Sequence, residues 1–154
     1  MPDYDVLPEP FPARTATASG TVDGVQTEVT SISFADKIMV TITQGGRLAH
    51  WIHVPLPDAT QHTAQPSHFA NDLDDDLPDS ELLPMAHLTA TTVLGGTVEE
   101  RNTVGQLLAT QIASAVLMKT PEERRMVVVG LGLEGKELGR EGFGEVVGLV
   151  LEVL

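Results

Sequence analysis

Residues 32–54 constrain the fold most, because they predict two β-strands joined by the dipeptide Gly45-Gly46. Residues 37–44 are rich in β-branched side chains, which suit a pleated, half-buried surface. Two consecutive glycines supply the positive φ angles that a two-residue hairpin turn needs. We therefore expect a β-hairpin here, with the other strands and the helices arranged around it.

Both faces of this hairpin carry apolar side chains. Pairing across the turn gives one face with three opposed pairs: Ile42 with Ala49, Val40 with Trp51, and Ile38 with His53. A layer of helices covers one face of a sheet, so the second face needs another cover, which we expect to be a partner sheet near Trp51 or Met39. Five residues are candidates for this partner interface: Met39, Leu48, Trp51, Ile52 and Val54.

The remaining elements follow from periodicity and turn signals. Further strands are expected at residues 14–19, 25–34, 85–93 and 126–133, and the unbroken apolar run of the last predicts burial on both of its faces. Thr97 and Glu100 form a capping box that opens a helix ending near Met118, and residues 138–154 predict a second helix. The expected fold class is α+β. It has an antiparallel sheet of about six strands, a four-strand meander plus two later ones, with two helices on one face and the other face available to a partner sheet.

Two segments stand apart in composition. Residues 1–13 contain four prolines and predict a flexible tail. Residues 57–84 carry six acids between Asp72 and Glu81 and few apolar groups, which predicts a disordered acidic insertion. Residues 14–154 are therefore expected to form a single domain interrupted by that insertion.

Charge and cysteine content exclude several classes of function. The net charge is -13 at pH 7, which would repel phosphate backbones and anionic lipid headgroups, so we expect no nucleic-acid or membrane partner. The chain has no cysteine, which excludes disulfides, thiolate zinc sites and cysteine nucleophiles and favours an intracellular location. The N-terminus lacks the basic, apolar pattern of a signal or transit peptide.

One glycine motif suggests nucleotide binding. Gly130, Gly132 and Gly135 match the dinucleotide fingerprint and lie between a predicted strand and a predicted helix. The fingerprint requires a βαβ unit with an acid about 20 residues on, and only 19 residues follow Gly135, with no second strand among them. A glycine-rich exit from a buried strand is the favoured interpretation, and a small nucleotide-binding enzyme that uses residues 130–135 is the alternative.

Metal and catalytic patterns are weaker. His50 and His53 point to opposite faces of a strand, His62 and His68 lie in the insertion, and His87 has no acid nearby in sequence. Residues 71–76 are similar to a calcium loop but lack its glycine and closing glutamate. No serine nucleophile elbow occurs. We therefore expect no metal site, no cofactor, no catalytic residue and no enzyme activity.

Several blocks of sequence, in order and spacing, resemble the proteasome assembly chaperone 3 family. They are Thr27-Glu28-Val29, residues 38–44, Val93-Leu94-Gly95-Gly96, the helix at 103–116, and residues 126–129. The resemblance covers roughly residues 25–54 and 85–154. The Thr-Gln-Gly turn and the Leu-Gly-Gly before the helix are its most telling pieces.

This resemblance implies a small chaperone that acts without nucleotide in the cytoplasm and the nucleus. It implies pairing with a proteasome assembly chaperone 4-like subunit, a homodimer being the alternative, and binding to proteasome α subunits during α-ring assembly. A non-catalytic adaptor or scaffold subunit of another complex shares every compositional feature and remains a competing hypothesis.

Overall fold

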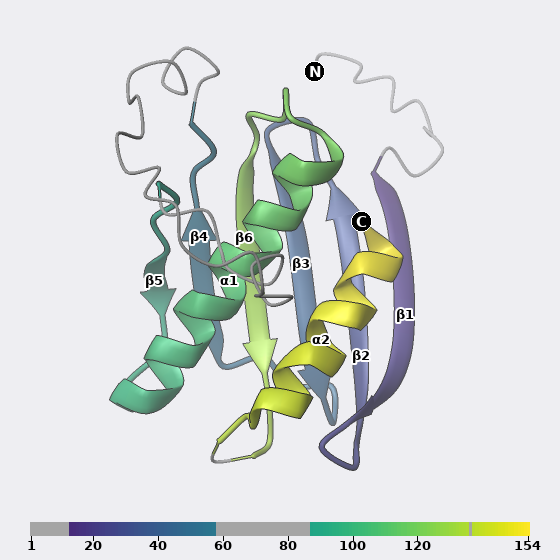
Figure 1. Ribbon diagram of the computed structural model, residues 1–154, viewed down its shortest axis with the longest axis vertical. Helices are drawn as coiled ribbons and strands as arrows, with labels where there is room; N and C mark the ends of the chain where they lie inside the picture. The colour runs from purple at the N-terminus through teal and green to yellow at the C-terminus, as the bar shows by residue number, and fades with distance from the viewer. Residues whose placement is uncertain (1–12, 58–86, 136) are drawn as a thin grey trace, which may run out of the picture.

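The computed structural model describes residues 13–57, 87–135 and 137–154. It contains one six-stranded sheet and two helices (Figure 1). The elements in chain order are β1 (Arg14–Val22), β2 (Val25–Ser33), β3 (Lys37–Gln44), β4 (His50–Val54), β5 (Thr91–Leu94), α1 (Glu99–Lys119), β6 (Met126–Gly132) and α2 (Arg140–Val153). The predicted α+β class, with six strands and two helices, is confirmed.

The predicted β3–β4 hairpin is wrong. The strand order is β1-β2-β3-β6-β4-β5, so β6 lies between β3 and β4. It pairs parallel with β3, where Val40 faces Val129, and antiparallel with β4, where Ile52 faces Val129 from the other side. The predicted pairs between residues 38–42 and 49–53 therefore do not form, and the meander ends after three strands.

Gly45 and Gly46 nevertheless have the positive φ angles that the turn prediction required, +67° and +70°. Instead of closing a hairpin, the loop that they open carries the chain past the end of β6, where the Ala49 amide donates a hydrogen bond to the Leu131 carbonyl (2.9 Å). The backbone conformation of the two glycines was predictable from the sequence. The position of β4 beside β6, and not beside β3, was not predictable.

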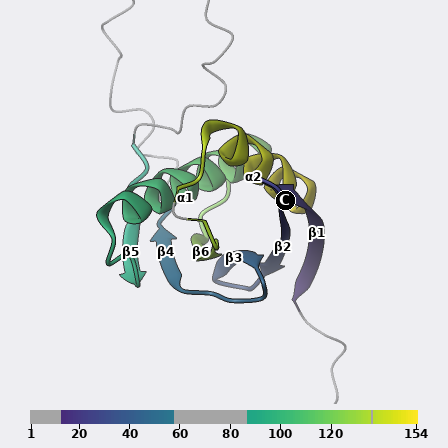
Figure 2. The same cartoon turned by 90° about the horizontal axis from the view of Figure 1, so that it is seen from below.

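Both helices pack on the same face of the sheet, as predicted (Figure 2). α1 covers β4, β5 and β6, and α2 covers β1 and β2. Between the helices and the sheet lies one apolar core, in which alternate strand residues such as Val40, Ile52 and Val129 have no exposed surface. The core continues through Leu108 and Ile112 of α1, in accordance with the predicted apolar stripe.

The start of α1 differs from the prediction. Its N-cap residue is Val98, which has extended backbone and makes no side-chain cap hydrogen bond, so Thr97 and Glu100 do not form a capping box. Asn102 instead donates its amide to the Val98 carbonyl (2.9 Å), which continues the helical pattern back to that residue. No helix in the described part of the chain has the length and apolar character needed to cross a membrane.

Several predictions concern residues outside the described ranges. They are the flexible tail up to residue 12, most of the acidic insertion, His62 and His68, the calcium-like residues 71–76, and the first two residues of the strand expected at 85–93. Residues 87–90 are described and are not in a strand, so the start expected at residue 85 is wrong: β5 begins at Thr91 and ends at Leu94.

Candidate functional site: the open face of the sheet

The sheet has one face that neither helix covers, which we call the open face (Figure 2). Strand alternation decides which residues lie there. On β3, Ile38, Val40 and Ile42 are buried towards the helices, so the residues between them, such as Met39 and Thr41, belong to the open face. The same alternation applies on β4, where Trp51 and His53 are half-buried between fully or largely buried neighbours.

The pairing register arranges the open face in rows that run across the strands. The first row contains Thr17, Thr30, Thr41, Gly130, Trp51 and Leu94. The second row contains Thr15, Ile32, Met39, Val128, His53 and Thr91. A third, shorter row begins with Lys37 opposite Met126. Because register fixes these neighbours, the large apolar side chains form one continuous patch, which we call the apolar patch: Ile32, Met39, Trp51, Leu94, Met126 and Val128.

The residues around the apolar patch are mostly uncharged and polar. Among the described strand residues, the ionisable side chains of the open face are Glu28, Lys37 and His53. Glu28 lies one row before the first row and Lys37 one row after the second, so the two charges occupy opposite ends of the face. Most of the remaining positions are threonine. An apolar centre with a polar margin and few charges is the pattern found in protein–protein interfaces.

Trp51 is the largest side chain of the patch, and its position depends on a glycine. Trp51 pairs directly with Gly130 on β6, and a Cβ atom added to Gly130 would lie 2.9 to 3.1 Å from three carbons of the indole ring. The ring therefore lies against the backbone of β6. The fixed indole ring presents a broad apolar surface of the kind that contributes most of the binding energy at protein–protein interfaces.

The structure separates the five predicted interface residues into two groups. Met39 and Trp51 lie on the open face, and Leu48, in the loop before β4, is 38% exposed. Ile52 and Val54 are fully buried in the core, so the prediction is wrong for these two. The cause is the wrong partner for β4: pairing with β6 turns the even-numbered residues of β4 towards α1.

Sequence reasoning also missed part of the patch. Val128 and Met126 are half-buried on the open face, so the expectation that both faces of residues 126–133 are buried is wrong for these residues. Ile32 and Leu94 were not singled out either, and Leu94 is 64% exposed. The apolar run of β6 could have indicated that Met126 and Val128 belong to the patch, because the residues on both faces of this strand are apolar.

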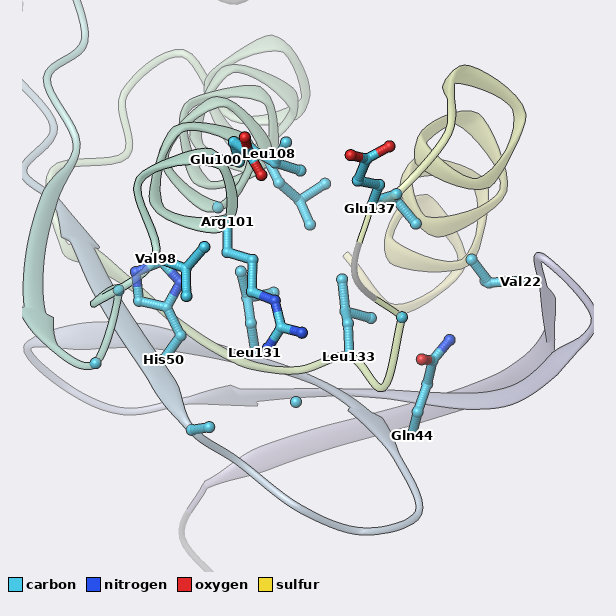
Figure 3. Close-up of a pocket in the computed structure, with 18 of the residues that line it drawn as sticks. Val22, Gln44, His50, Val98, Glu100, Arg101, Leu108, Leu131, Leu133 and Glu137 are labelled. Carbon is cyan, nitrogen blue, oxygen red and sulfur yellow. The ribbon is translucent and has the colours of Figure 1, made fainter.

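A cavity of about 620 Å³ lies elsewhere, between the first turns of α1, the segment before α2 and the ends of the parallel strands β3 and β6. Aliphatic side chains, including Leu108, Leu131 and Leu133, make most of its wall. Arg101 extends from α1 towards Leu131 and Leu133, while Glu100 and Glu137 come from opposite sides of the cavity (Figure 3). The lining therefore carries charges of both signs.

The glycine motif at 130–135 borders this cavity, and two of its glycines have packing explanations. Gly130 accommodates Trp51 on the opposite side of the sheet. A Cβ on Gly132 would overlap the carbonyl oxygen of Arg47, where the loop after β3 crosses β6. Both positions thus require glycine for close packing within the fold, which supports the glycine-rich exit from a strand over the dinucleotide fingerprint.

His50 and His53 point to opposite faces, as predicted: His50 is buried towards α1 and His53 lies on the open face. The His50 Nε2 atom lies 3.2 Å from the Thr92 hydroxyl, which in turn donates a hydrogen bond to Asn102. Burial lowers the pKa of His50, and the hydrogen bond with Asn102 opposes this in part. Within the described ranges, no three histidine or acidic side chains gather as a metal site.

Comparison with known proteins gives a likeness of fold. No protein-family model matches the chain, and no curated protein matches it in sequence. Among solved structures, the chain is similar to one in the "Crystal Structure of a Novel Chaperone Complex for Yeast 20S Proteasome Assembly", with a TM-score of 0.55 and 12% sequence identity. The match covers 90% of this chain and 97% of that chain. The six-stranded sheet with two helices is thus a fold that a chain of a chaperone complex for yeast 20S proteasome assembly also has.

Proposed function

We propose that this chain is a non-catalytic subunit of a proteasome assembly chaperone. In this role it pairs through its open face with the sheet of a second chaperone subunit, a chaperone 4-like protein or another copy of itself. The pair binds proteasome α subunits and promotes formation of the 20S α-ring, in the cytoplasm and the nucleus. The likeness to the yeast chaperone complex supports the fold-level part of this proposal, since the match spans nearly all of both chains.

The apolar patch is the observation that carries the proposal. A sheet with helices on one side only leaves its second side in water, where Met39, Val128 and Trp51 would be costly to expose. In a chain with a net charge of -13, the central rows of the open face carry no carboxylate. Packing of a second sheet, about 10 Å away, would cover these side chains without burying an unpaired charge.

The test is α-ring assembly in a reconstituted system. Purified proteasome α subunits are mixed with the wild-type chain or a variant, with and without a chaperone 4-like subunit, and ring formation is followed by native gel electrophoresis. The informative variant is Val128→Lys, which places an ammonium group at the centre of the apolar patch. Leu151→Lys is the matched control, because Leu151 is 57% exposed on α2, on the helix side of the sheet.

We expect the wild type and Leu151→Lys to accelerate ring formation and Val128→Lys to lose the effect, with all three chains remaining folded by circular dichroism. Equal activity of Val128→Lys and the wild type would exclude the open face as the functional surface. No effect of the wild type on α-ring formation, alone or with a partner subunit, would exclude the assembly role.

An adaptor or scaffold subunit of a different complex is the second candidate, because an apolar patch of this kind does not identify its partner. Affinity capture from the native cell distinguishes the two roles. Recovery of proteasome α subunits with the wild type, and their loss with Val128→Lys, supports the chaperone. Recovery of the subunits of an unrelated complex, with the same dependence on Val128, supports the adaptor.

A further inference from the structure

We propose that the cavity on the helix side of the sheet binds a short apolar peptide whose two termini are both free. This binding site goes beyond the proposed function and does not rest on it. The cavity wall includes Leu131, which faces the helices, whereas the apolar patch lies on the opposite side of the sheet. The position of the cavity, its apolar wall and the charges around it support the proposal.

The topology places the cavity where a ligand site is expected. β3 and β6 are parallel neighbours, and the cavity lies at the end of the sheet where both strands finish. There α1 covers β4, β5 and β6, while the chain that leaves β6 continues into α2 over β1 and β2. The cavity lies between the two helices (Figure 3). A crevice outside the carboxyl ends of parallel strands is a general position for ligand binding.

The size and the wall of the cavity suit a small apolar ligand. Its volume of about 620 Å³ lies within the range of roughly 300–1,000 Å³ found for small-molecule sites. Leu108 and Leu131 form buried parts of the wall, and Val98, at the start of α1, is 48% exposed. An apolar side chain that enters the cavity would remove the exposed part of this surface from water.

Three charged side chains of the lining are available to a ligand. In the described part of the chain, no ion pair or side-chain hydrogen bond engages Glu100, Arg101 or Glu137. Arg101 extends towards Leu131 and Leu133, whereas Glu100 and Glu137 come from α1 and from the segment before α2 (Figure 3). The cavity therefore offers a guanidinium and two carboxylates at separate points around an aliphatic space.

Charges of both signs favour a ligand that also carries both. The carboxylate of a free peptide would pair with Arg101 and its ammonium with Glu100 or Glu137, with the apolar side chains between them. An extended tripeptide spans roughly 10 Å, which keeps its two charges apart, whereas a free amino acid carries them on one carbon. A fatty acid would leave the carboxylates of the cavity unpaired, and the phosphates of a nucleotide would be repelled by them.

Binding of one tripeptide in four forms tests the proposal. The probe is alanyl-leucyl-leucine with both termini free, with an N-terminal acetyl group, with a C-terminal amide, or with both blocks. Each block removes one charge and keeps the apolar side chains. Proton–nitrogen NMR spectra of the full chain report the site through the amide signals of Leu131 and Leu133. We expect the free tripeptide to shift these signals with a dissociation constant of about 1 mM.

The blocked forms should bind more weakly than the free tripeptide. Because the three charged side chains are exposed, each ion pair with the ligand contributes modestly. We expect either single block to weaken binding by about threefold, and the double block by about tenfold.

Two variants assign each terminus of the tripeptide to its partner. Arg101→Gln should weaken the free tripeptide by about threefold and leave the affinity of the C-terminal amide unchanged, because that form has no carboxylate to lose. The double variant Glu100→Gln and Glu137→Gln should weaken the free tripeptide to a similar extent and leave the acetylated form unchanged. All three residues are exposed, so we expect the variants to keep the melting temperature of the wild type.

The controls change the charge by the same amounts away from the cavity. Arg14→Gln matches Arg101→Gln, because Arg14 lies at the far end of β1 from Val22, which lines the cavity. Glu122→Gln combined with Glu152→Gln matches the double variant, and neither residue lines the cavity. We expect both controls to bind all four forms as the wild type does.

Two results would overturn the proposal: no saturable shift of the two amide signals with the free tripeptide up to about 10 mM, or equal binding of the free and doubly blocked forms. Tighter binding of octanoate than of the tripeptide would also overturn it, because the cavity would then select an aliphatic carboxylate. None of these results decides the proposed function, since α-ring assembly with Val128→Lys tests the opposite side of the sheet.

Discussion

At the scale of single residues, His50 shows how packing on a sheet changes the chemistry of a side chain. Its ring fits where two glycines leave room: a Cβ added to Gly105 would lie 2.5 Å from the ring, and one added to Gly96 would lie 2.9 Å from Nε2. The side chain is 8% exposed, and the pKa of His50 falls below its ordinary value of 6.5 because burial penalises the charged form. The folded state therefore favours the neutral form of the His50 imidazole.

This lowered pKa predicts a pH dependence of stability. A histidine with a lower pKa in the folded state binds protons more readily when the chain is unfolded, so its contribution is complete above about pH 6.5. It is lost as the pH falls from there towards the folded pKa. We expect the free energy of unfolding, measured with urea, to fall between pH 7.5 and 5.5 in the wild type and to fall less in His50→Gln. Equal slopes in the two proteins would contradict the assignment.

Gly132 predicts a second effect at this scale. Because a Cβ here would overlap the backbone carbonyl of Arg47, which cannot rotate away as a side chain can, we expect Gly132→Ala to destabilise the fold by about 2 kcal/mol or more. The control is Gly148→Ala in α2, where an added Cβ meets nothing within 4 Å. That change should stabilise the helix by up to about 1 kcal/mol. Thermal unfolding tests both predictions: the melting temperature should fall in Gly132→Ala and rise in Gly148→Ala.

At the scale of elements, the insertion of β6 between β3 and β4 organises the sheet, and one arginine secures its first residue. The Arg125 guanidinium donates hydrogen bonds to the Ser33 hydroxyl (2.7 Å) and the Phe34 carbonyl (2.8 Å), next to the β2–β3 turn. It also pairs with Glu123, at 2.7 Å between Nη2 and Oε2. These contacts join the start of β6 to the end of β2.

The same cluster yields a prediction about Arg125→Lys. Lysine keeps the charge but cannot reproduce the forked hydrogen bonds of the guanidinium, so we expect a loss of about 1–2 kcal/mol in the free energy of unfolding. Arg14→Lys, at an exposed position at the start of β1, should change it by less than about 0.5 kcal/mol. A loss of the same size in both variants would show that the geometry of the Arg125 cluster is unimportant.

Glu123 gives this cluster a pH signature. Its hydrogen bond with Arg125 is the main reason that the pKa of Glu123 is lowered to about 2. A carboxyl whose pKa is lowered on folding stabilises the fold above its ordinary pKa of 4.5 and loses this effect as the pH falls towards 2. We therefore expect the difference in unfolding free energy between the wild type and Glu123→Gln to shrink over this interval, as measured with urea.

At the scale of the whole molecule, the segment between β4 and β5 connects two adjacent antiparallel strands. Leu56 after β4 and Leu88 before β5 are both buried in the core. Both ends of the connection are therefore anchored by core packing. We expect deletion of residues 59–82 to leave the melting temperature within about 5 °C of the wild type, because lengthening or shortening a loop changes its closure entropy only slowly. Loss of cooperative unfolding would contradict this.

The same deletion addresses a possible contribution of the acidic insertion to the proposed function. Unchanged α-ring assembly by the shortened chain would exclude a required role for residues 59–82. A chain that is folded but inactive would place part of the function there.

Much of the secondary structure was predictable from local chemistry. The strands about Asp23-Gly24, the helix ending near Lys119 and the apolar strand at 126 all lie close to their predicted positions, because periodicity and turn residues act over a few neighbours. The candidate site was predicted in part: Met39 and Trp51 are on the open face, but Ile52 and Val54 are in the core. The error came from strand partners, which local rules do not fix.

The sequence by itself determined that the chain forms an α+β domain, that two consecutive glycines turn the backbone after β3, and that apolar side chains occur on more than one face of its strands. Only the tertiary structure decided that β6 enters between β3 and β4, and hence which side chains gather in the apolar patch. The physical reason is that a parallel pair such as β3–β6 joins segments more than 80 residues apart. Its stability comes from the apolar core between the sheet and the two helices, which exists only once the whole sheet has formed.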